Sequence, residues 1–371
     1  MPSSAFRIID ADGHVMEPLG MWERYIDPRY RAQAPRIHRT PGRTGFESGG
    51  RLSPRPECLS PAMLEAFRAR VREHLGPYLE ADYDPPSQIK AMDAGGIEMA
   101  FLYPTQGLYV ASIDDLDPEL ALAICRAYND WILEFCGYAP QRLRPVGMLT
   151  ALHDPALAVA EAGRLADRGF RGIFVRPNPV RGRNLDDPAY ESLWATCAAR
   201  GLAVGVHEGV GAYLPEAGAD RFQSFFACHS ASHPMEQMLA LMALVAGGVL
   251  ERHPRLRVGF LEAGCGWLPY WLWRMDEHWE QCRGIAGEPD LPLAPSEYFR
   301  RQCWISCEPD EPYVGRVLDL IGENRLLFAS DYPHPDHKWP ATVDSMLAMP
   351  IPDAVKRKVL WDNPAALYGL S

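Results

Sequence analysis

Asp12 and His14 stand two residues apart at the end of a short apolar run that begins at Ile8. The run predicts a buried strand, and alternate side chains of a strand point to the same face. A carboxylate and an imidazole on one face can bind the same divalent metal ion. Asp-x-His is common by chance, so the pair gains meaning only from the residues at other strand ends.

Three further residues of the metal-binding type follow predicted strands. His207 closes the run 203–207, Glu262 closes the run 257–262, and Asp331 closes the run 325–331. In a parallel barrel the carboxyl ends of the strands meet at one mouth, so these groups converge with Asp12 and His14. Two imidazoles with carboxylates predict one divalent ion, Zn²⁺, Mn²⁺ or Fe²⁺, with open positions for water and substrate.

Short apolar runs alternate with longer amphipathic segments along the chain, which indicates parallel strands joined by helices. The predicted strands are 6–12, 97–103, 143–149, 172–175, 203–207, 257–262, 302–306 and 325–331. The predicted helices are 86–94, 118–137, 155–168, 188–200, 233–250, 266–282, 312–322 and 339–348, with a closing C-terminal helix at 353–368. Eight such pairs favour a (β/α)8 (TIM) barrel, although the alternation fits a doubly wound sheet almost as well.

We expect one domain over residues 1–371, interrupted by two insertions. The first, residues 16–85, is too long for a structureless loop and predicts a lid or subdomain after the first strand. The second, residues 209–228, contains Tyr213, Phe222, Phe225 and Phe226. These aromatic side chains either wall a substrate pocket or pack the insertion against the barrel.

Composition limits the possible partners. A formal charge of -11 argues against a nucleic-acid or anionic-membrane surface, because both need clustered Lys and Arg. The longest apolar stretch, residues 238–250, is too short for a membrane span, and no secretory signal is visible. The nine cysteines lack Cys-x-x-Cys spacing, as expected for reduced thiols. We therefore expect a cytoplasmic protein that acts on a small molecule. The sequence leaves open whether the protein forms a homodimer.

Several polar residues near strand ends are candidates for substrate binding. Arg176 follows the fourth strand and would hold a substrate carboxylate or carbonyl, or else pair with an acidic loop. Tyr103 ends the second strand. His229 and His334 are candidates for the pocket wall, His334 also for a contact behind the metal ligands. On the segment 266–282, Trp271, Trp273 and His278 recur at helical spacing and predict barrel packing or an interface.

The segment 326–336, which contains Asp331-Tyr332-Pro333-His334, resembles the amidohydrolase superfamily. The likeness is to the amidohydrolase 2 branch, which includes aminocarboxymuconate semialdehyde decarboxylase and related decarboxylases and hydrolases. Residues 206–209, 261–269 and 362–368 resemble that branch in the same order. The resemblance implies a (β/α)8 barrel in which Asp12, His14, His207 and Asp331 bind a catalytic divalent metal.

Two positions depart from the pattern of that branch. Many members begin with His-x-His or Glu-x-His, where this chain has Asp12. Decarboxylating members usually carry a histidine after the sixth strand, where this chain has Glu262.

Glu262 favours a hydrolase in which metal-activated water attacks an ester, thioester or amide of a small organic acid-type substrate. Glu262 would move the proton and Asp331 would share that work, or Glu262 would instead orient a ligand. The alternative is a nonoxidative decarboxylase of an aromatic or unsaturated acid, with a protonated Glu262 or Asp331 supplying the proton. A second alternative is a non-catalytic binding barrel.

Overall fold

A computed structural model of the chain describes residues 6–40, 43–53, 61–110, 112–149, 152–207, 217–218, 221–222, 224–287, 290–334 and 338–370. Its central sheet has eight strands, each hydrogen-bonded to the next in chain order, and the paired strands are parallel. The strands are β1 (Ile9–His14), β5 (Met99–Tyr103), β6 (Leu143–Met148), β7 (Gly172–Val175), β8 (Ala203–His207), β9 (Arg257–Leu261), β10 (Cys303–Cys307) and β11 (Leu326–Phe328).

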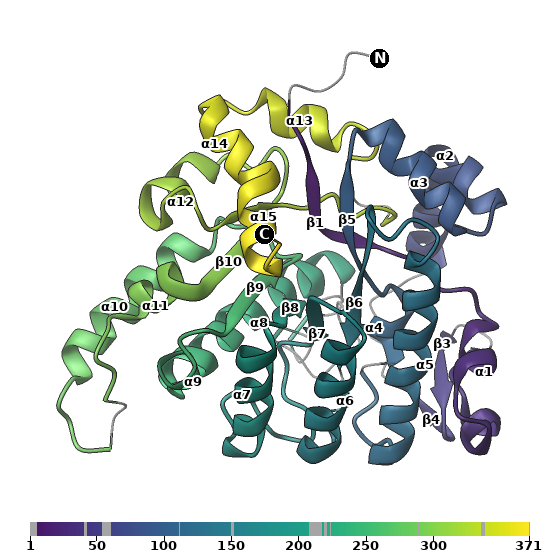
Figure 1. Ribbon diagram of the computed structural model, residues 1–371, viewed down its shortest axis with the longest axis horizontal. Coiled ribbons are helices and arrows are strands. Elements are labelled where there is room, and N and C mark those ends of the chain that lie inside the picture. The colour runs from purple at the N-terminus through teal and green to yellow at the C-terminus, as the bar shows by residue number, and fades with distance from the viewer. Residues whose placement is uncertain are drawn as a thin grey trace.

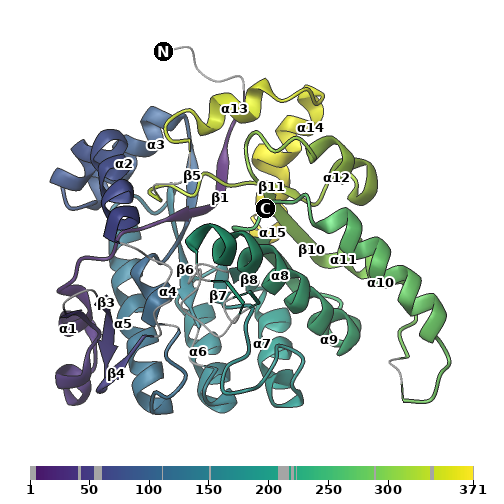
Figure 2. The same ribbon diagram turned by 180° about the vertical axis from the view of Figure 1, so that it is seen from behind.

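The first and last strands meet and close the sheet. The backbone N–H of His14 donates to the carbonyl of Tyr332 at 2.7 Å, and the N–H of Asp331 donates to the carbonyl of Asp12 at 3.1 Å. The prediction of a (β/α)8 barrel is therefore confirmed, and the doubly wound sheet is excluded. Figures 1 and 2 show the strands at the centre of the molecule, with helices around them.

Helices surround the barrel, and three of them begin at a recognisable signal. The main ones are α3 (Pro85–Gly95), α5 (Pro118–Cys136), α6 (Pro155–Asp167), α7 (Glu191–Arg200), α8 (Phe225–Ala246), α10 (Leu268–Cys282), α11 (Pro295–Gln302), α12 (Val314–Ile321), α13 (Thr342–Ala348), α14 (Asp353–Arg357) and α15 (Asn363–Tyr368). An Asp-Pro pair starts α3, α5 and α6. The side chains of Asp84, Asp117 and Asp154 accept hydrogen bonds from the first-turn N–H groups, and the proline fits the first helical position because it has no N–H.

The interior of the barrel is filled by aromatic side chains. The hydroxyl of Tyr103 lies 2.8 Å from that of Tyr368 on α15, and Tyr368 donates to the carbonyl of Ala11 at 2.7 Å. Gly205 on β8 is required by this packing, because a Cβ there would lie 2.4 Å from the Tyr103 hydroxyl. The C-terminal helix therefore plugs one end of the barrel, which leaves the other end for chemistry.

The segment between β1 and α3 has secondary structure of its own. It contains α1 (Met21–Tyr25), a 3₁₀ turn (Pro28–Gln33), the antiparallel strands β2 (Arg36–Thr40), β3 (Arg43–Ser48) and β4 (Arg51–Leu52), and α2 (Pro61–Glu80). Phe46 of β3 stacks on Tyr109 of α4 (Gln106–Val110), with ring centroids 5.7 Å apart. This small sheet lies beside α4 and α5 (Figure 1).

Helix α8 differs from its prediction. We expected a helix over 233–250, but it begins at Phe225, because Ser224 accepts a hydrogen bond from Ala227 and caps the first turn. Pro234 lies inside the helix rather than at its start. Phe225 and Phe226, predicted to belong to an insertion, are therefore helical, whereas Tyr213 lies outside the described residues.

Two strand boundaries also differ. β1 runs through His14, so Asp12 and His14 lie within the strand, and β11 ends at Phe328, so Asp331 lies beyond its strand. α4, α11 and the short helix α9 (Val249–Arg252) were not predicted. Among the described helices, none combines the length and the apolar character that a membrane crossing requires.

Candidate metal centre

Five side chains from four strand ends meet at the carboxyl end of the barrel. Nε2 of His207 lies 3.2 Å from Oδ1 of Asp12 and 3.1 Å from Oε2 of Glu262. Nε2 of His14 lies 3.2 Å from Oδ1 of Asp331, 3.7 Å from Asp12 and 3.8 Å from Glu262. The sequence expectation that these residues converge agrees with this geometry. Their roles remain predictions.

The donor atoms of this cluster are buried and lack hydrogen bonds. Among the described residues, both carboxylate oxygens of Asp12, Nε2 of His14, Nε2 of His207 and Oε2 of Glu262 have no hydrogen-bond partner. Buried polar atoms are normally satisfied, so such a set calls for a bound group. Donor atoms of Asp12, His14 and His207 lie within 4.8 Å of one another, as do those of His14, Glu262, Asp331 and His334. Imidazole and carboxylate donors at this spacing fit one divalent metal ion.

His14 is held in the orientation that a metal ligand needs. Its Nδ1 lies 2.9 Å from the carbonyl oxygen of Pro104, an acceptor that requires Nδ1–H as the donor. The proton on Nδ1 leaves the lone pair of Nε2 for the cluster. The loop after β5 therefore selects the tautomer of a residue on β1.

The two carboxylates that follow β9 and β11 share an unusual backbone conformation. Glu262 has φ 54° and Asp331 has φ 51°, in the left-handed region that residues other than glycine rarely adopt. The N–H of Glu262 donates to the hydroxyl of Ser306 at 3.2 Å, and hydrogen bonds of this kind help to hold the turn. Strained residues of this type concentrate at functional sites.

Asp10, a residue that the sequence analysis missed, supports the cluster from below. Its carboxylate accepts hydrogen bonds from the N–H of Ser330 at 2.9 Å, the hydroxyl of Ser330 at 2.5 Å and the N–H of Asp12 at 3.2 Å. Gly13 is needed beside it, because a Cβ there would lie 2.7 Å from the Asp10 carboxylate. The hydrogen bonds of Asp10 thus link β1 to the turn that carries Asp331. The signal in the sequence that could have identified Asp10 is its position two residues before Asp12.

Burial and neighbouring charges shift the pKa values in the metal-free cluster. Burial and the nearby Asp331 together raise the pKa of Glu262 to about 7, against the lowering effect of the surrounding imidazoles. Burial lowers the pKa of His207, but the carboxylates of Asp12 and Glu262 outweigh burial and raise it to about 9. Burial also raises the pKa of Asp10 to about 7 against its hydrogen bonds from Ser330. Without a metal, the cluster therefore holds protons at neutral pH.

A pocket of about 390 Å³ opens beside Glu262. The side chains that line it come from α8 and from the loops after β9 and β10: His229, Ser230, His233, Pro234, Glu262, Ala263, Gly264, Glu308 and Glu311. Oε1 of Glu262 lies 3.6 Å from Nε2 of His233, whose ring stacks on that of His229. Glu311 accepts hydrogen bonds from the N–H groups of Cys265 and Gly266 and so shapes the loop behind Glu262. Glu308 and Glu311 were missed in the sequence because the predicted strand ended at residue 306, whereas β10 ends at Cys307, directly before Glu308.

The structure places the other predicted substrate residues at different distances from this pocket. His229 lines it. His334 lies behind the cluster, with Nδ1 2.7 Å from Oδ1 of Asp331 and Nε2 3.1 Å from the hydroxyl of Thr105. Tyr103 is 1% exposed, and its ring stacks on His207 with centroids 5.2 Å apart.

Arg176, after β7, is 1% exposed and is held away from this pocket by contacts of its own. It pairs with Asp114 at 2.5 Å and donates to the carbonyl of Pro179. These contacts match the acidic-loop alternative raised from the sequence. Contact of Arg176 with substrate remains a prediction.

A (β/α)8 barrel with imidazole and carboxylate donors at its carboxyl end defines a class of metal-dependent barrel enzymes. This chain belongs to the amidohydrolase family, whose model matches residues 9–370. The resemblance read from the strand-end motifs is therefore confirmed.

Two curated relatives are decarboxylases. The chain is 28% identical over 261 residues to 2-amino-3-carboxymuconate-6-semialdehyde decarboxylase from Dictyostelium discoideum. The aligned region covers 68% of this chain and 67% of that protein. The chain is also 26% identical over 267 residues to gamma-resorcylate decarboxylase from Rhizobium radiobacter, and this aligned region covers 67% of this chain and 76% of that protein.

Solved structures share the fold over nearly the whole chain. An amidohydrolase from Mycobacterium avium subsp. paratuberculosis has a TM-score of 0.79 at 25% identity, with 99% of both chains covered. A 5-carboxyvanillate decarboxylase from Novosphingobium aromaticivorans, solved with bound manganese and 3-methoxy-4-hydroxy-5-nitrobenzoic acid, has a TM-score of 0.72 at 20% identity, with 99% and 98% covered.

These relatives overturn the prediction of a hydrolase. The chain is an enzyme of the amidohydrolase family, but both of these curated relatives are named as decarboxylases. The physical reason for the error is that the donor set is the same in both reactions. Metal, imidazole and carboxylate groups polarise a carbonyl or hold a carboxylate equally well, so ligand type does not say which bond breaks.

Proposed function

We propose that this chain is a metal-dependent, nonoxidative decarboxylase of a small aromatic or unsaturated carboxylic acid. The observation that carries the proposal is the position of Glu262. Its carboxyl group lies 3.1 Å from His207 in the metal cluster and also lines the adjoining pocket. One acidic side chain therefore faces both the candidate metal and the space for a substrate. The decarboxylase relatives support the same reaction.

We assign Asp12, His14, His207 and Asp331 as the metal ligands. The unsatisfied, buried donor atoms of Asp12, His14 and His207 support this assignment, as does the contact of Asp331 with His14. A divalent ion bound there would supply positive charge for the substrate carboxylate and a neighbouring oxygen. Because a manganese ion is bound in a solved neighbour, we propose Mn²⁺ first, with Zn²⁺ and Fe²⁺ as the other ions to test.

Glu262 is the residue that we propose as the proton donor. In the reaction the bond between the carboxylate carbon and the adjoining carbon breaks, and carbon dioxide leaves. The electron pair stays on the adjoining carbon, which takes a proton from Glu262. The left-handed turn at Glu262 aims its side chain into the mouth of the barrel, and His233 at 3.6 Å lies within reach of the carboxyl group from the pocket side.

The remaining predicted residues have narrower roles. We propose that His229 contacts the substrate, because it lines the pocket with His233. His334 and Tyr103 touch the rings or carboxylates of the proposed ligands, so we propose that they position those ligands. Glu308 adds a negative charge to the pocket, which favours substrates with hydroxyl or amino groups at the end away from the carboxylate.

The test is carbon dioxide release by the metal-loaded protein without oxygen or an organic cofactor. The panel is hydroxybenzoic acids and carboxylated muconates, each assayed with Mn²⁺, Zn²⁺ and Fe²⁺. Glu262→Gln keeps the size of the side chain and removes the carboxyl proton, so we expect it to bind metal and lose turnover. The matched control is Glu134→Gln, an exposed carboxylate on α5.

No carbon dioxide from any member of the panel would contradict the decarboxylase. Full turnover by the Glu262→Gln protein would contradict the role of Glu262 alone. Exchange of deuterium from solvent into the product at the carbon that lost its carboxylate separates proton delivery from the loss of substrate binding.

A further inference from the structure

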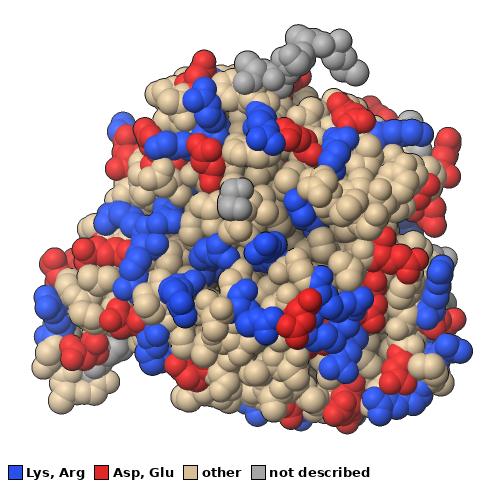
Figure 3. Space-filling model, viewed as in Figure 1, with Lys and Arg blue, Asp and Glu red and all other residues tan. Residues whose placement is uncertain are grey.

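Glu17 is a buried carboxylate on the loop after β1. Acidic and basic side chains are interspersed over the outer face that Figure 3 shows. Glu17, by contrast, is 1% exposed and lies three residues beyond His14. A carboxylate in such a place is costly unless hydrogen bonds compensate for the lost water. Its hydrogen-bond partners therefore indicate what it does.

The partners of the Glu17 carboxylate are backbone N–H groups at the start of α4. Oε2 accepts hydrogen bonds from the N–H of Thr105 at 3.1 Å and of Gln106 at 2.9 Å, and Oε1 accepts one from Gly107 at 2.8 Å. The first N–H groups of a helix have no partner within the helix, so an acceptor there stabilises the first turn. Burial raises the pKa of Glu17, and the hydrogen bonds from these N–H groups oppose that rise. Glu17 therefore caps a helix that lies far along the chain.

The start of α4 is attached closely to Glu17. The side-chain amide of Gln106 donates to the backbone carbonyl of Glu17 at 2.7 Å. A Cβ on Gly107 would lie 2.8 Å from the side chain of Pro104 and 3.3 Å from Oε1 of Glu17, so glycine is needed for this close approach. The loop of residues 104–107 is therefore fixed against the segment that follows β1.

The loop that Glu17 fixes contains the acceptor that sets the tautomer of His14. The carbonyl of Pro104 accepts the hydrogen bond from Nδ1–H of His14 at 2.9 Å. Pro104 directly precedes Thr105, whose N–H is bonded to Glu17, so a shift of the loop would move this carbonyl away from the ring. Loss of the acceptor would allow the proton to move to Nε2, where it blocks the lone pair that a metal needs.

The same loop reaches a second proposed ligand through His334. The hydroxyl of Thr105 lies 3.1 Å from Nε2 of His334, whose Nδ1 lies 2.7 Å from Oδ1 of Asp331. The ring centroids of His14 and His334 are 4.1 Å apart. A displacement of the loop would therefore disturb the contacts of Asp331 as well as those of His14.

We propose that Glu17 is a positioning residue of the metal centre, which holds residues 104–107 so that His14 presents the lone pair of Nε2 to the metal. The inference rests on the proposed ligand role of His14 and extends it to a carboxylate outside the clustered donor atoms. The contacts form a closed ring. His14 is hydrogen-bonded to Pro104, which is followed by Thr105, and Thr105 is hydrogen-bonded to Glu17. The chain itself joins Glu17 to His14, so the segment that carries the ligand also anchors the loop that orients it.

The first test is the Mn²⁺ affinity of the Glu17→Gln protein, measured by titration calorimetry. The amide has one acceptor oxygen in place of two, and its NH₂ group would face a backbone N–H. We therefore expect the Kd for Mn²⁺ to rise at least about 10-fold, as is typical when the support of a metal-binding histidine is lost. The matched control is Glu119→Gln, the same change at an exposed carboxylate in the first turn of α5, which should leave the Kd unchanged.

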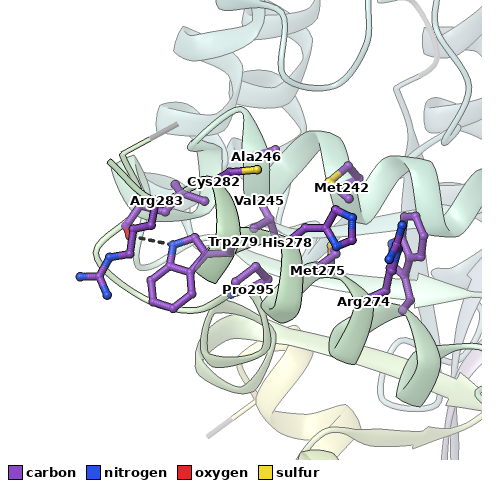
Figure 4. Close-up of a pocket in the computed structure, with 12 residues that line it drawn as sticks. Met242, Val245, Ala246, Arg274, Met275, His278, Trp279, Cys282, Arg283 and Pro295 are labelled. Carbon is purple, nitrogen blue, oxygen red and sulfur yellow. Dashed lines mark hydrogen bonds between the residues drawn. The ribbon is translucent and has the colours of Figure 1, made fainter. Parts of the chain in front are cut away.

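The tautomer of His14 is a second readout, which depends neither on bound metal nor on turnover. ¹⁵N NMR of metal-free protein labelled at histidine, recorded where the ring is neutral, should show the proton of His14 on Nδ1 in the unmodified protein. In the Glu17→Gln protein we expect part of this signal to shift to that of the Nε2–H form. The internal reference is His278, which lines the groove between α8 and α10 (Figure 4), has a side chain that is 45% exposed, and should keep its spectrum.

A Glu17→Gln protein that is less stable in urea, but keeps both the Mn²⁺ affinity and the Nδ1–H signal of His14, would overturn the proposal, because Glu17 would then only cap α4. If Glu17→Gln does not fold, Glu17→Asp replaces it in the same measurements as a milder change. Failure of the unmodified protein to bind Mn²⁺ would contradict the proposed ligands. The NMR test of Glu17 uses metal-free protein and would still stand, so the two failures can be told apart.

Discussion

Two clusters of charged residues, each built around a buried carboxylate, differ in whether that carboxylate accepts hydrogen bonds. In the first, Glu161 of α6 is 0% exposed and accepts hydrogen bonds from Arg126 at 2.9 Å, from Asn129 at 2.9 Å and from two atoms of Arg164 at 2.9 and 2.7 Å. Asn129 also bonds the backbone of Met148 through both ends of its amide. These residues join α5, β6 and α6, and both oxygens of Glu161 and both ends of the Asn129 amide are hydrogen-bonded.

The carboxylates of the candidate metal centre are not satisfied by hydrogen bonds in this way. Asp12 is 1% exposed, and neither of its oxygens accepts a hydrogen bond within the described chain, while two imidazoles and two further carboxylates crowd around it. Buried charges are costly unless they are both paired and hydrogen-bonded, so the Glu161 cluster stabilises the fold by itself, whereas the metal centre gains from a bound cation. The comparison separates a structural cluster from a functional one by hydrogen bonding alone.

The largest effect that sharpens this comparison is expected for Asp12→Asn. The change preserves shape but removes a negative charge from the proposed ligand set, so we expect bound metal to be lost and turnover to fall at least about 1,000-fold, or about 4 kcal/mol. Metal content by mass spectrometry and carbon dioxide release measure this. In the unmodified protein, Mn²⁺ at 100 times its Kd should add about 2.7 kcal/mol to the free energy of unfolding. If Mn²⁺ stabilised the Asp12→Asn protein by the same amount, the distinction between the metal centre and the Glu161 cluster would be wrong.

Glu161→Gln is the same acid-to-amide change in the other cluster, and the opposite result is expected. The amide cannot accept from both arginines, so the free energy of unfolding should fall by about 2 kcal/mol, as measured with urea. Because Glu161 lies outside the metal centre, metal content and the Mn²⁺ affinity should stay unchanged. A protein that loses its metal while remaining folded would show that the two clusters are not independent.

The smallest expected effect is the pH dependence of metal binding. Although burial lowers the pKa of His207, Asp12 and Glu262 raise it to about 9 in the metal-free protein, so its imidazole is protonated below that pH. A metal must displace this proton, and the Mn²⁺ affinity should therefore rise about tenfold, or about 1.4 kcal/mol, per pH unit from pH 7 to pH 9. Titration calorimetry in several buffers checks this through the protons released. An affinity that is flat over this range would contradict His207 as a ligand.

Local patterns were sufficient for most of the barrel. The alternation of short apolar runs with longer amphipathic segments located the eight strands and most helices, because both patterns depend on neighbouring residues. The error at α8 arose where a local signal was ambiguous. Pro234 is common at a helix start, but here it lies inside a helix that Ser224 had already begun.

The residues that hold the metal centre together were harder to find. Asp10, Ser330 and Glu311 act through hydrogen bonds to segments far along the chain, or across the turn that carries Asp331. Their types and spacing have no local pattern. Glu308 directly follows β10 and lines the pocket together with residues of the loop after β9.

The sequence by itself determined which groups can do chemistry and that they stand at strand ends: Asp12, His14, His207, Glu262 and Asp331. That result follows from side-chain type and from the two-residue period of a strand, which are local properties. Only the tertiary structure decided that the barrel closes between β1 and β11, which brings Asp12 and Asp331 together although they stand at opposite ends of the chain. Only the structure also placed the carboxylate of Glu17 at the start of α4, because hydrogen bonds between segments far apart in the chain depend on how the whole chain folds.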